Sequence, residues 1–384
     1  MKKPLYLAAV VGMFSSPLYA QSSVTLYGAI DNGLSYISNS GGKSLVSATT
    51  NNIYGSRWGL LGSEDLGGGM RAIFQLENGF NAMNGTITQG GTLFGRQAYA
   101  GLSGDFGKIT LGRQYDSVGD FVGQFGAASQ WAGDRGNHPG DLDNLHGTNR
   151  TNNAVKYLSP KYAGFTFGGM YSFGGVAGQM ARNQIWSIGT GYANGPLALG
   201  AGYLNIRNPN YSFFGDTQTG SLTASNMTNL TYSGYASAGI QEIFALGGRY
   251  SFSDSFRVSA TYSNTRFGDL GAEPGIPNLA PRGSTAIFNN AEINMTYFVV
   301  PTVALSAAYD YTKGAGVNDA LYHQLSVGAD YFLSKTTDLY LTGFWQHAAG
   351  TDSTGKPARA TITGLSPSSN ANQIEVNAGI RHKF

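Results

Sequence analysis

The chain has 384 residues and no cysteine, which excludes thiolate metal sites, thiol nucleophiles and a disulfide framework. Only 12% of its residues are charged, about half the usual share for a soluble domain, whereas glycine (56), tyrosine (23) and phenylalanine (21) are abundant. The formal net charge of +2 becomes zero if Lys2 and Lys3 are removed with an N-terminal segment, and this balance gives no electrostatic reason to expect a nucleic-acid partner.

The N-terminus is typical of a secretory signal peptide. Two lysines precede an apolar run at residues 5–14, and Ala20 stands at the expected cleavage site. The run is too short to span a bilayer as a helix, which argues against an N-terminal anchor. We therefore expect residues 1–20 to be a cleaved signal peptide and residues 21–384 to form a transmembrane β-barrel domain.

Alternation of apolar and polar residues indicates strands with one polar face each. The pattern is clear in residues 24–31, continues in residues 70–77, and is strongest in residues 373–384. Successive side chains of a strand point to opposite faces of the sheet, so one face is apolar and the other is polar.

Short turns and long loops alternate along the chain. Short turns are predicted at residues 63–69, 104–107, 159–164, 194–196, 253–255, 300–302 and 334–338. Longer polar segments are predicted near residues 39–51, 82–92, 116–149, 174–182, 208–240, 268–288, 314–320 and 349–371. These connections join sixteen strands, and an even number with short turns on one side is typical of a transmembrane barrel.

A soluble all-β fold such as a propeller or a large sandwich would also give many short strands. A propeller would normally show repeats of blade length, and the sequence shows none. The sequence therefore favours an all-β, 16-stranded antiparallel transmembrane β-barrel.

Motifs for catalysis, cofactors and metals are missing from the sequence. The five histidines show no metal-ligand spacing, and no nucleophile-elbow, phosphate-binding or dinucleotide-binding motif occurs in a suitable context. His138 and His146 share a segment with Asp134, Asp141 and Asp143, which could bind a cation, although a solvated polar loop is the better interpretation. We expect no enzymatic activity, no cofactor and no metal.

Several arginines occupy positions that the alternation assigns to one face or the other. Arg57 and Arg71 are predicted to point into the lumen, where Arg96 would join them on one arc of the wall, although each could simply be solvated. Arg113 shares the outward face of Leu111, and an arginine facing lipid costs about 2 to 4 kcal/mol near the midplane. We therefore predict that Arg113 lies at a subunit interface, with the membrane edge as the alternative.

Five ordered segments carry a family resemblance. They are SVTLYGAID at 23–31, GSEDLGGGMRAIFQLENGF at 62–80, LFGRQAYAGLSGDFG at 93–107, LGRQY at 111–115 and IRHKF at 380–384. Together they resemble the trimeric general-diffusion porins of Gram-negative outer membranes, in particular the β-proteobacterial branch.

The resemblance implies a homotrimer of sixteen-stranded barrels in the outer membrane, each with a long third loop folded into the lumen. By its length and its place after the LGRQY segment, this loop corresponds to residues 116–149. The resemblance also makes the terminal Phe384 part of the assembly signal.

The same resemblance implies a pore constriction. Arg57, Arg96 and Arg150 match its wall positions, and Asp120 is the best match to an acid of the loop. Arg71 and Asp116 are assigned to the same constriction. The chain departs from the family pattern at two positions, where Leu61 replaces a common lysine and Gln124 replaces an acid found in some relatives.

The leading functional hypothesis is a water-filled channel for passive diffusion of ions and small hydrophilic solutes. Three arginines facing one acid predict a weak preference for anions. A substrate-specific channel for a sugar, phosphate or organic acid is the alternative, and a barrel adhesin that acts through its surface loops is a second one.

Overall fold

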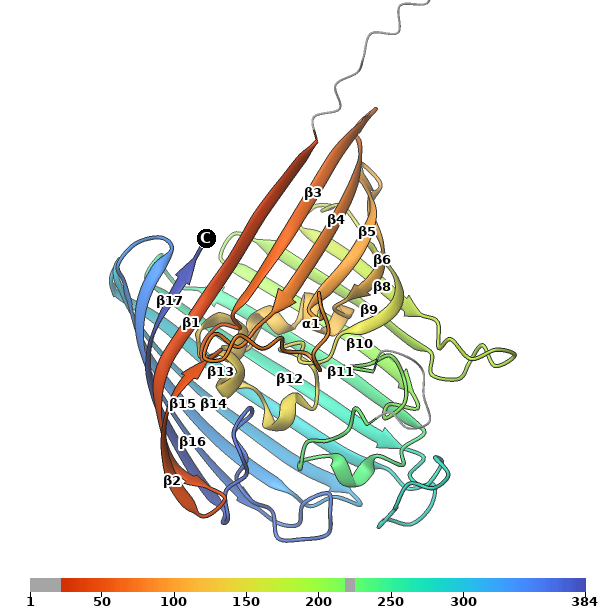
Figure 1. Cartoon of the computed structure of the whole chain (residues 1–384), viewed down its shortest axis with the longest axis vertical. Coiled ribbons are helices and arrows are strands. Elements are labelled where there is room, and N and C mark those ends of the chain that lie inside the picture. Colours follow the sequence, from red (N-terminus) through yellow and green to blue (C-terminus); the bar gives the residue numbers. More distant parts are fainter. Residues whose placement is uncertain (1–21, 218–224) are drawn as a thin grey trace, which may run out of the picture.

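The strands pair antiparallel with their neighbours along the chain, and pairing of the first strand with the last closes the sheet into a barrel (Figure 1). The computed structural model describes residues 22–217 and 225–384. The predicted signal peptide at residues 1–20 lies outside the described residues, as does part of the predicted loop at residues 208–240.

The elements are as follows. The strands of the described residues are β1 (Ser23–Ser40), β2 (Lys43–Thr50), β3 (Arg57–Gly67), β4 (Met70–Gly79), β5 (Gln97–Gly104), β6 (Gly107–Gln114), β7 (Thr151–Leu158), β8 (Phe165–Ser172), β9 (Ile185–Asn194), β10 (Leu197–Arg207), β11 (Ile240–Ser251), β12 (Phe256–Gly268), β13 (Ala286–Val300), β14 (Val303–Gly316), β15 (Leu321–Phe332), β16 (Thr337–Ala349) and β17 (Asn372–Lys383). Helical turns are α1 (Ser117–Phe121), η1 (Gly123–Phe125), η2 (Ala128–Ala132), η3 (Gly133–Gly136), η4 (Pro139–Asp141) and η5 (Ser233–Tyr235). In the described part of the chain, no helix is long and apolar enough to cross a membrane.

The first two barrel strands differ from the expectation. The predicted loop at residues 39–51 is instead largely the hairpin of β1 and β2, whose turn is Gly41-Gly42 with φ of 62° and 107°. Positive φ at both central residues suits a tight hairpin turn. Both β2 and β3 pair with β1, so the seventeen strand segments of the described residues form sixteen barrel strands, as predicted.

The real interruption lies between β2 and β3, at residues 51–56. Backbone N–H groups of Ile53 and Tyr54 each donate to the buried carboxylate of Asp31 at 2.7 Å. The Asn52 side chain donates to the Tyr340 hydroxyl at 2.9 Å. These bonds keep residues 51–56 out of the pairing with β1 and set the position where β3 begins.

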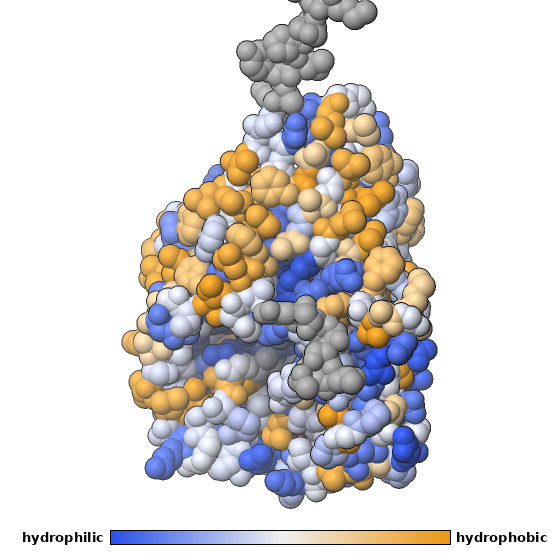
Figure 2. Space-filling model, turned by 45° about the vertical axis from the view of Figure 1, so that its right-hand side comes forward, coloured by the Kyte–Doolittle hydropathy of each residue, from blue (hydrophilic) through white to orange (hydrophobic). Residues whose placement is uncertain are grey.

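The two faces of the strands are inverted relative to a soluble protein. In β17, Ile374, Val376 and Ile380 are 43–45% exposed, whereas the alternating Gln373 and Glu375 are fully buried. Figure 2 shows hydrophobic residues covering much of the barrel's outer surface, with hydrophilic residues gathered at the end that carries the long loops. An apolar outer face and a polar interior are what a barrel in lipid requires.

Aromatic side chains cluster near the short turns. Phe165 packs on Tyr192 with ring centroids 4.6 Å apart, and Tyr250 packs on Phe252 at 4.9 Å. Phe252 also stacks on Phe256. Such rings mark the membrane interface of a barrel, where their apolar bodies meet lipid and their polar edges meet water.

The last residue, Phe384, helps to close the barrel by bonding to Gly28 of β1. Its backbone N–H donates to the Gly28 carbonyl at 3.0 Å, and its own carbonyl accepts from the Gly28 N–H at 2.9 Å. A Cβ atom at Gly28 would lie 2.4 Å from Cζ of Phe384, so the ring needs glycine at this position.

We expect deletion of Phe384 to reduce the amount of assembled barrel in the outer membrane, because two closing hydrogen bonds and the ring contact are lost together. Phe384→Ala keeps the backbone bonds and removes only the ring, so it separates the two contributions. The measurement is the yield of heat-modifiable protein in outer-membrane fractions. Normal yield from the deletion would contradict the expectation.

Candidate functional site

Two cavities lie along the inner side of the barrel and share one residue, Tyr115. The first has a volume of about 410 Å³, and we call it the arginine cavity; its charged lining residues are Arg57, Arg96, Asp134, His146, Arg150 and Asp216. The second has a volume of about 610 Å³, and we call it the lysine cavity; its charged lining residues are Lys108, Asp120, Lys156, Lys161 and Arg249.

Arg57 reaches the arginine cavity because β3 begins directly after the interrupting segment. Its Nε donates to the Gly55 carbonyl at 2.8 Å, and its guanidinium lies 4.1 Å from the centroid of the Tyr54 ring. Tyr54 is itself fixed by Asp31 through its backbone N–H. The orientation of Arg57 therefore depends on a contact with β1 as well as on its own strand.

Tyr115 joins the other two arginines of the cavity. Its hydroxyl accepts a hydrogen bond from Arg96 at 3.0 Å and another from Arg150 at 2.9 Å. The Arg150 guanidinium also lies 5.0 Å from the ring centroid. Although burial alone would raise the pKa of Tyr115, the positive charges of Arg150 and Arg96 lower it.

Only one of these arginines has a carboxylate partner. Nε of Arg96 forms an ion pair with Oε1 of Glu77 at 2.7 Å, on the neighbouring strand β4. Within the described residues no ion pair is formed by Arg57 or by Arg150, whose NH1 donates to the Thr148 carbonyl at 2.7 Å. Two guanidinium charges are therefore not neutralised by contact with an acid.

We call residues 116–149 the loop segment. It packs against strands on a different part of the barrel wall from Arg57 and Arg96. It begins with α1, whose N-cap residue Asp116 accepts from the N–H groups of Val118 (2.7 Å) and Gly119 (3.1 Å). The second Asp116 oxygen accepts from Asn144 at 2.6 Å. The Asp116 carboxylate thus caps the N-terminus of α1 and joins it to Asn144, near the other end of the loop segment.

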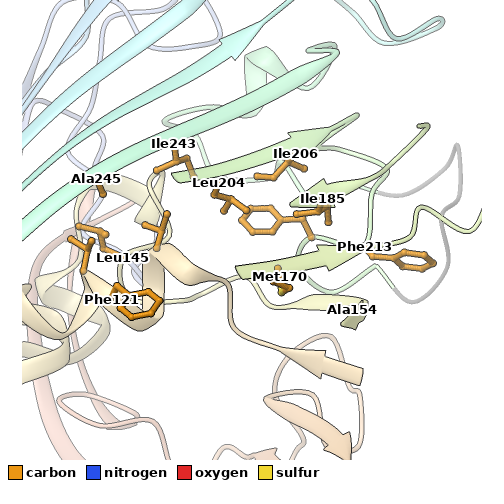
Figure 3. Packing of buried hydrophobic residues seen from close by; sticks show 13 residues of the cluster. Phe121, Leu145, Ala154, Met170, Ile185, Leu204, Ile206, Phe213, Ile243 and Ala245 are labelled. Atoms are coloured by element: carbon orange, nitrogen blue, oxygen red, sulfur yellow. The ribbon is translucent and has the colours of Figure 1, made fainter. Parts of the chain in front are cut away.

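Glycines allow α1 to lie directly on the wall. We call the following set the glycine floor: Gly189, Gly191, Gly200, Gly202 and Gly247, on β9, β10 and β11. A Cβ atom at Gly200 would lie 2.1 Å from the Phe121 carbonyl oxygen, and one at Gly189 would lie 2.4 Å from the Phe121 ring. Figure 3 shows Phe121 and Leu145 of the loop segment beside apolar side chains of these strands, including Leu204 and Ile243.

Polar contacts fix the rest of the loop segment to strands further round the barrel. Asn294 of β13 donates to the Phe125 carbonyl at 2.8 Å, and Gln130 donates to the Ser259 hydroxyl of β12 at 3.0 Å. Arg135 forms an ion pair with Glu375 of β17 at 2.9 Å. The wall residues in these contacts are buried side chains of the barrel.

A buried charge cluster also anchors the loop segment. The imidazole of His138 contacts Asp143 at 2.6 Å, Glu292 of β13 at 3.3 Å and Asp310 of β14 at 4.0 Å. Burial alone would lower the pKa of His138, but the negative carboxylates raise it well above its usual range. The resulting imidazolium holds the loop segment to two strands. The described residues contain no group of His, Asp and Glu side chains arranged to hold a metal ion.

Two acids line the arginine cavity, Asp216 and Asp134, and the sequence singled out neither as a constriction residue. Asp134 contacts Nε2 of His146 at 2.9 Å. Burial alone would raise the pKa of Asp134, but His146, Arg135 and Arg96 lower it well below its usual range, so it is an anion at neutral pH. The predicted loop acid, Asp120, lies instead in the lysine cavity, where it forms an ion pair with Lys156.

Two further predicted constriction residues lie outside both cavities. Arg71 is exposed near the turn between β3 and β4, and along β4 it is roughly 26 Å from Gly79, the residue that pairs with Arg57. Asp116 is 1% exposed and serves as the cap of α1. The structure thus brings Arg57, Arg96 and Arg150 together and leaves these two apart from them.

Pairing of β6 with β5 stays regular through Arg113, which opposes Ala98 and shares the face of the exposed Leu111 as predicted, but loop residues cover its side chain. Its Nε donates to the Gly95 carbonyl and its NH1 to the Gly215 carbonyl, both at 2.8 Å, and it forms an ion pair with Asp216 at 3.6 Å. The side chain is only 10% exposed. The irregular pairing of β6 with β7 between Gly112 and Gln114 does not reverse the faces of β6, because Thr110 and Gln114 both line the lysine cavity. The place of Arg113 at a subunit interface stays a prediction.

Comparison with known proteins agrees with this architecture. A family model described as Gram-negative porin matches residues 7–347. The chain belongs to the Gram-negative porin family. This porin is 29% identical to an outer membrane porin protein of Bordetella pertussis and 28% identical to outer membrane porin protein 32 of Delftia acidovorans, in both cases over the whole of both chains.

Solved structures share the barrel of this porin. An anion-selective porin from Comamonas acidovorans matches with a TM-score of 0.73 and 23% identity, over 95% of this chain and 100% of that one. A trimer form of OmpT from Vibrio cholerae matches with a TM-score of 0.62 and 17% identity, over 94% of this chain and 99% of that one. The family match and the outer membrane porins among the relatives make this chain a multi-pass outer-membrane barrel and a channel for passive diffusion of ions and small hydrophilic solutes.

Sequence reasoning missed Tyr115 and the position of Asp134 in this porin. Tyr115 ends the LGRQY segment, directly before the loop segment, and a tyrosine at that junction was the available signal. Asp134 was noticed only as a member of a polar loop with His146. No local pattern showed that the loop segment would carry it to the arginines.

Proposed function

We propose that this porin prefers anions weakly and that the loop segment narrows the lumen at the arginine cavity. The observation that carries the proposal is the pair of guanidiniums, Arg57 and Arg150, which line this cavity without an ion pair in the described residues. Charges in a narrow, partly desolvated passage act more strongly on a passing ion than charges on an open surface. A solved porin of the same fold is described as anion-selective.

The test is a set of reversal potentials across a salt gradient in planar bilayers. Arg57→Ser, Arg96→Ser and Arg150→Ser should each shift the potential towards cation preference, and Asp134→Asn should shift it towards anions. Asp120→Asn should have a smaller effect than Asp134→Asn, because Asp120 lies in the other cavity beside Lys156.

Salt provides the internal control. The shifts should shrink as salt rises from about 0.1 M to about 1 M, since the screening length falls from about 10 Å to about 3 Å. Identical reversal potentials for the wild type and all five variants would show that these residues do not line the narrowest passage. Absence of any conductance would overturn the channel itself.

Trimeric assembly is a further part of the proposal, and the trimer form of OmpT, which shares the fold, supports it. We expect Arg113→Ala to lower the melting temperature of the oligomer, because it frees the loops around Gly95 and Gly215 that its guanidinium joins. Arg113→Lys keeps the charge and serves as the control. Unchanged oligomer melting in the alanine variant would remove Arg113 from the interface.

We also propose that the chain has no enzymatic activity. Its relatives are named as porins, and a channel needs no group that reacts with its solutes.

A further inference from the structure

The lysine cavity contains more positive charge than its acids balance. Lys156 is paired with Asp120, and its Nζ also donates to the Tyr115 carbonyl at 2.8 Å. Within the described residues, Lys108, Lys161 and Arg249 form no ion pair. Three cations that line one cavity without an acid partner attract an anion.

These cations come from three separate parts of the barrel wall near the short turns. Lys108 follows the start of β6, Lys161 lies in the turn between β7 and β8, and Arg249 lies two residues before the end of β11. Each cation thus enters the lining of the lysine cavity from a different strand or turn.

The remaining polar lining is uncharged and can both donate and accept hydrogen bonds. It includes the amides and the phenol of Gln75, Gln97, Tyr99, Gln114 and Gln124, together with the hydroxyls of Thr110, Tyr115, Thr166 and Tyr192. Gln75 and Tyr99 are already joined by a 2.6 Å hydrogen bond, which fixes the Tyr99 hydroxyl. Amide side chains recognise hydroxyl groups, because a hydroxyl also donates and accepts.

We propose that the lysine cavity is a binding site for a small hydroxylated organic anion of the sugar-acid class. The carboxylate would lie among Lys108, Lys161 and Arg249, and the hydroxyls would face the amides. The volume of about 610 Å³ falls within the range of roughly 300 to 1,000 Å³ that is usual for small-molecule pockets. The proposal deepens the proposed function and rests on it, because the solute must enter through the open barrel.

The two cavities then act in series. Tyr115 lines both of them, and its hydroxyl is held by Arg96 and Arg150 on one side while its carbonyl is held by Lys156 on the other. An anion that leaves the arginine cavity meets the second set of cations directly beyond this residue. The first cavity supplies general anion preference, and the second retains anions that also carry hydroxyls.

The experiment uses three probes and two measurements on the full-length protein. Gluconate carries a carboxylate and hydroxyls, glucose carries hydroxyls only, and acetate carries a carboxylate only. Their effects on single-channel current are measured in planar bilayers, and their binding to the detergent-solubilised protein is measured by calorimetric titration. We expect gluconate to interrupt the current and to bind more tightly than either of the other probes.

Variants locate the site. Lys161→Gln and Arg249→Gln should each weaken gluconate binding about tenfold, the usual effect of losing one hydrogen bond to a charged group. Lys335→Gln, which removes an exposed cation from another short turn, should bind as the wild type does. Arg57→Ser should alter ion preference and should weaken gluconate binding less than Lys161→Gln or Arg249→Gln does.

The two hypotheses fail in different ways. A conducting channel to which gluconate binds no better than acetate or glucose overturns the sugar-acid site and leaves the porin function intact. Equal gluconate binding by wild type, Lys161→Gln and Arg249→Gln overturns the assignment to this cavity. Loss of conductance alone would overturn the channel, and the titration would still decide the site.

Discussion

Gly200→Ala should reduce single-channel conductance and make the open channel flicker between levels. The added Cβ atom would lie 2.1 Å from the Phe121 carbonyl oxygen and 3.0 Å from the Phe125 ring, on the glycine floor. Neither neighbour can turn aside easily, because one is backbone and the other is a fully buried ring. The loop segment must therefore move away from the glycine floor, together with Phe121 and Phe125, which line the lysine cavity.

A matched control lies on the neighbouring strand. Gly248 of β11 follows the floor residue Gly247, but a Cβ atom there would meet the flexible end of Leu199, at 2.9 Å. Gly248→Ala should therefore conduct as the wild type does. Overpacking a fitted contact typically costs about 1 to 3 kcal/mol, so Gly200→Ala should also melt at a lower temperature. Equal conductance of the two variants would show that the glycine floor does not position the loop segment.

The barrel could be predicted from sequence because its signals are local. The alternation in β17 states which side chains face lipid, and each short turn has its own Gly, Ser or Pro signal. The first loop was placed wrongly for a local reason as well. Residues 47–50 read Ser-Ala-Thr-Thr, a small and polar run that looks like a loop, yet they belong to β2 and pair with β1.

The candidate site was only partly predictable because its geometry depends on distant contacts. Arg57, Arg96 and Arg150 were found through their motifs, but Arg57 is aimed by Asp31 through the interrupting segment. The partner acid depends on how the loop segment folds over the glycine floor. Nothing near Asp120 or Asp134 in the sequence states which one will face the arginines.

Arg113 shows what the alternation argument leaves out. Leu111 is 57% exposed, as predicted. Two residues later Arg113 lies on the same face, but it bonds to the carbonyls of Gly95 and Gly215 and pairs with Asp216, so loop residues cover it. Alternation assigns a face only within a strand, and Tyr115, which follows the end of β6, lines both cavities.

His138→Gln should cause the largest loss of stability among single changes in the loop segment. The imidazolium faces Asp143 on its own segment, Glu292 on β13 and Asp310 on β14, and all four groups are at most 4% exposed. A neutral side chain would leave three buried carboxylates without their cation. Removing one partner of a buried ion pair typically costs about 3 to 5 kcal/mol.

The pH dependence of the wild type follows from the signs of two shifts. The carboxylates raise the pKa of His138, so its contribution is complete below the unfolded value of about 6.5 and is lost as pH rises through the raised value. Burial would raise the pKa of Asp143, but His138 lowers it, so its contribution is complete above about 4 and is lost as pH falls through the lowered value. Both contributions are therefore complete between about pH 4 and pH 6.5.

We accordingly expect the melting temperature of the wild type to fall as pH rises towards the raised pKa of His138. The current noise should rise in parallel, because the loop segment loosens. His138→Gln should melt lower than the wild type at pH 6 and should lack the additional loss at high pH, because it has no proton to release at this position. His347→Gln, which removes an exposed histidine bonded to Asn372, is the control and should follow the wild type. If the melting temperature of His138→Gln fell by the same amount at high pH, the titration would belong to another group. If that variant melted as the wild type does at pH 6, the imidazolium would not anchor the loop segment.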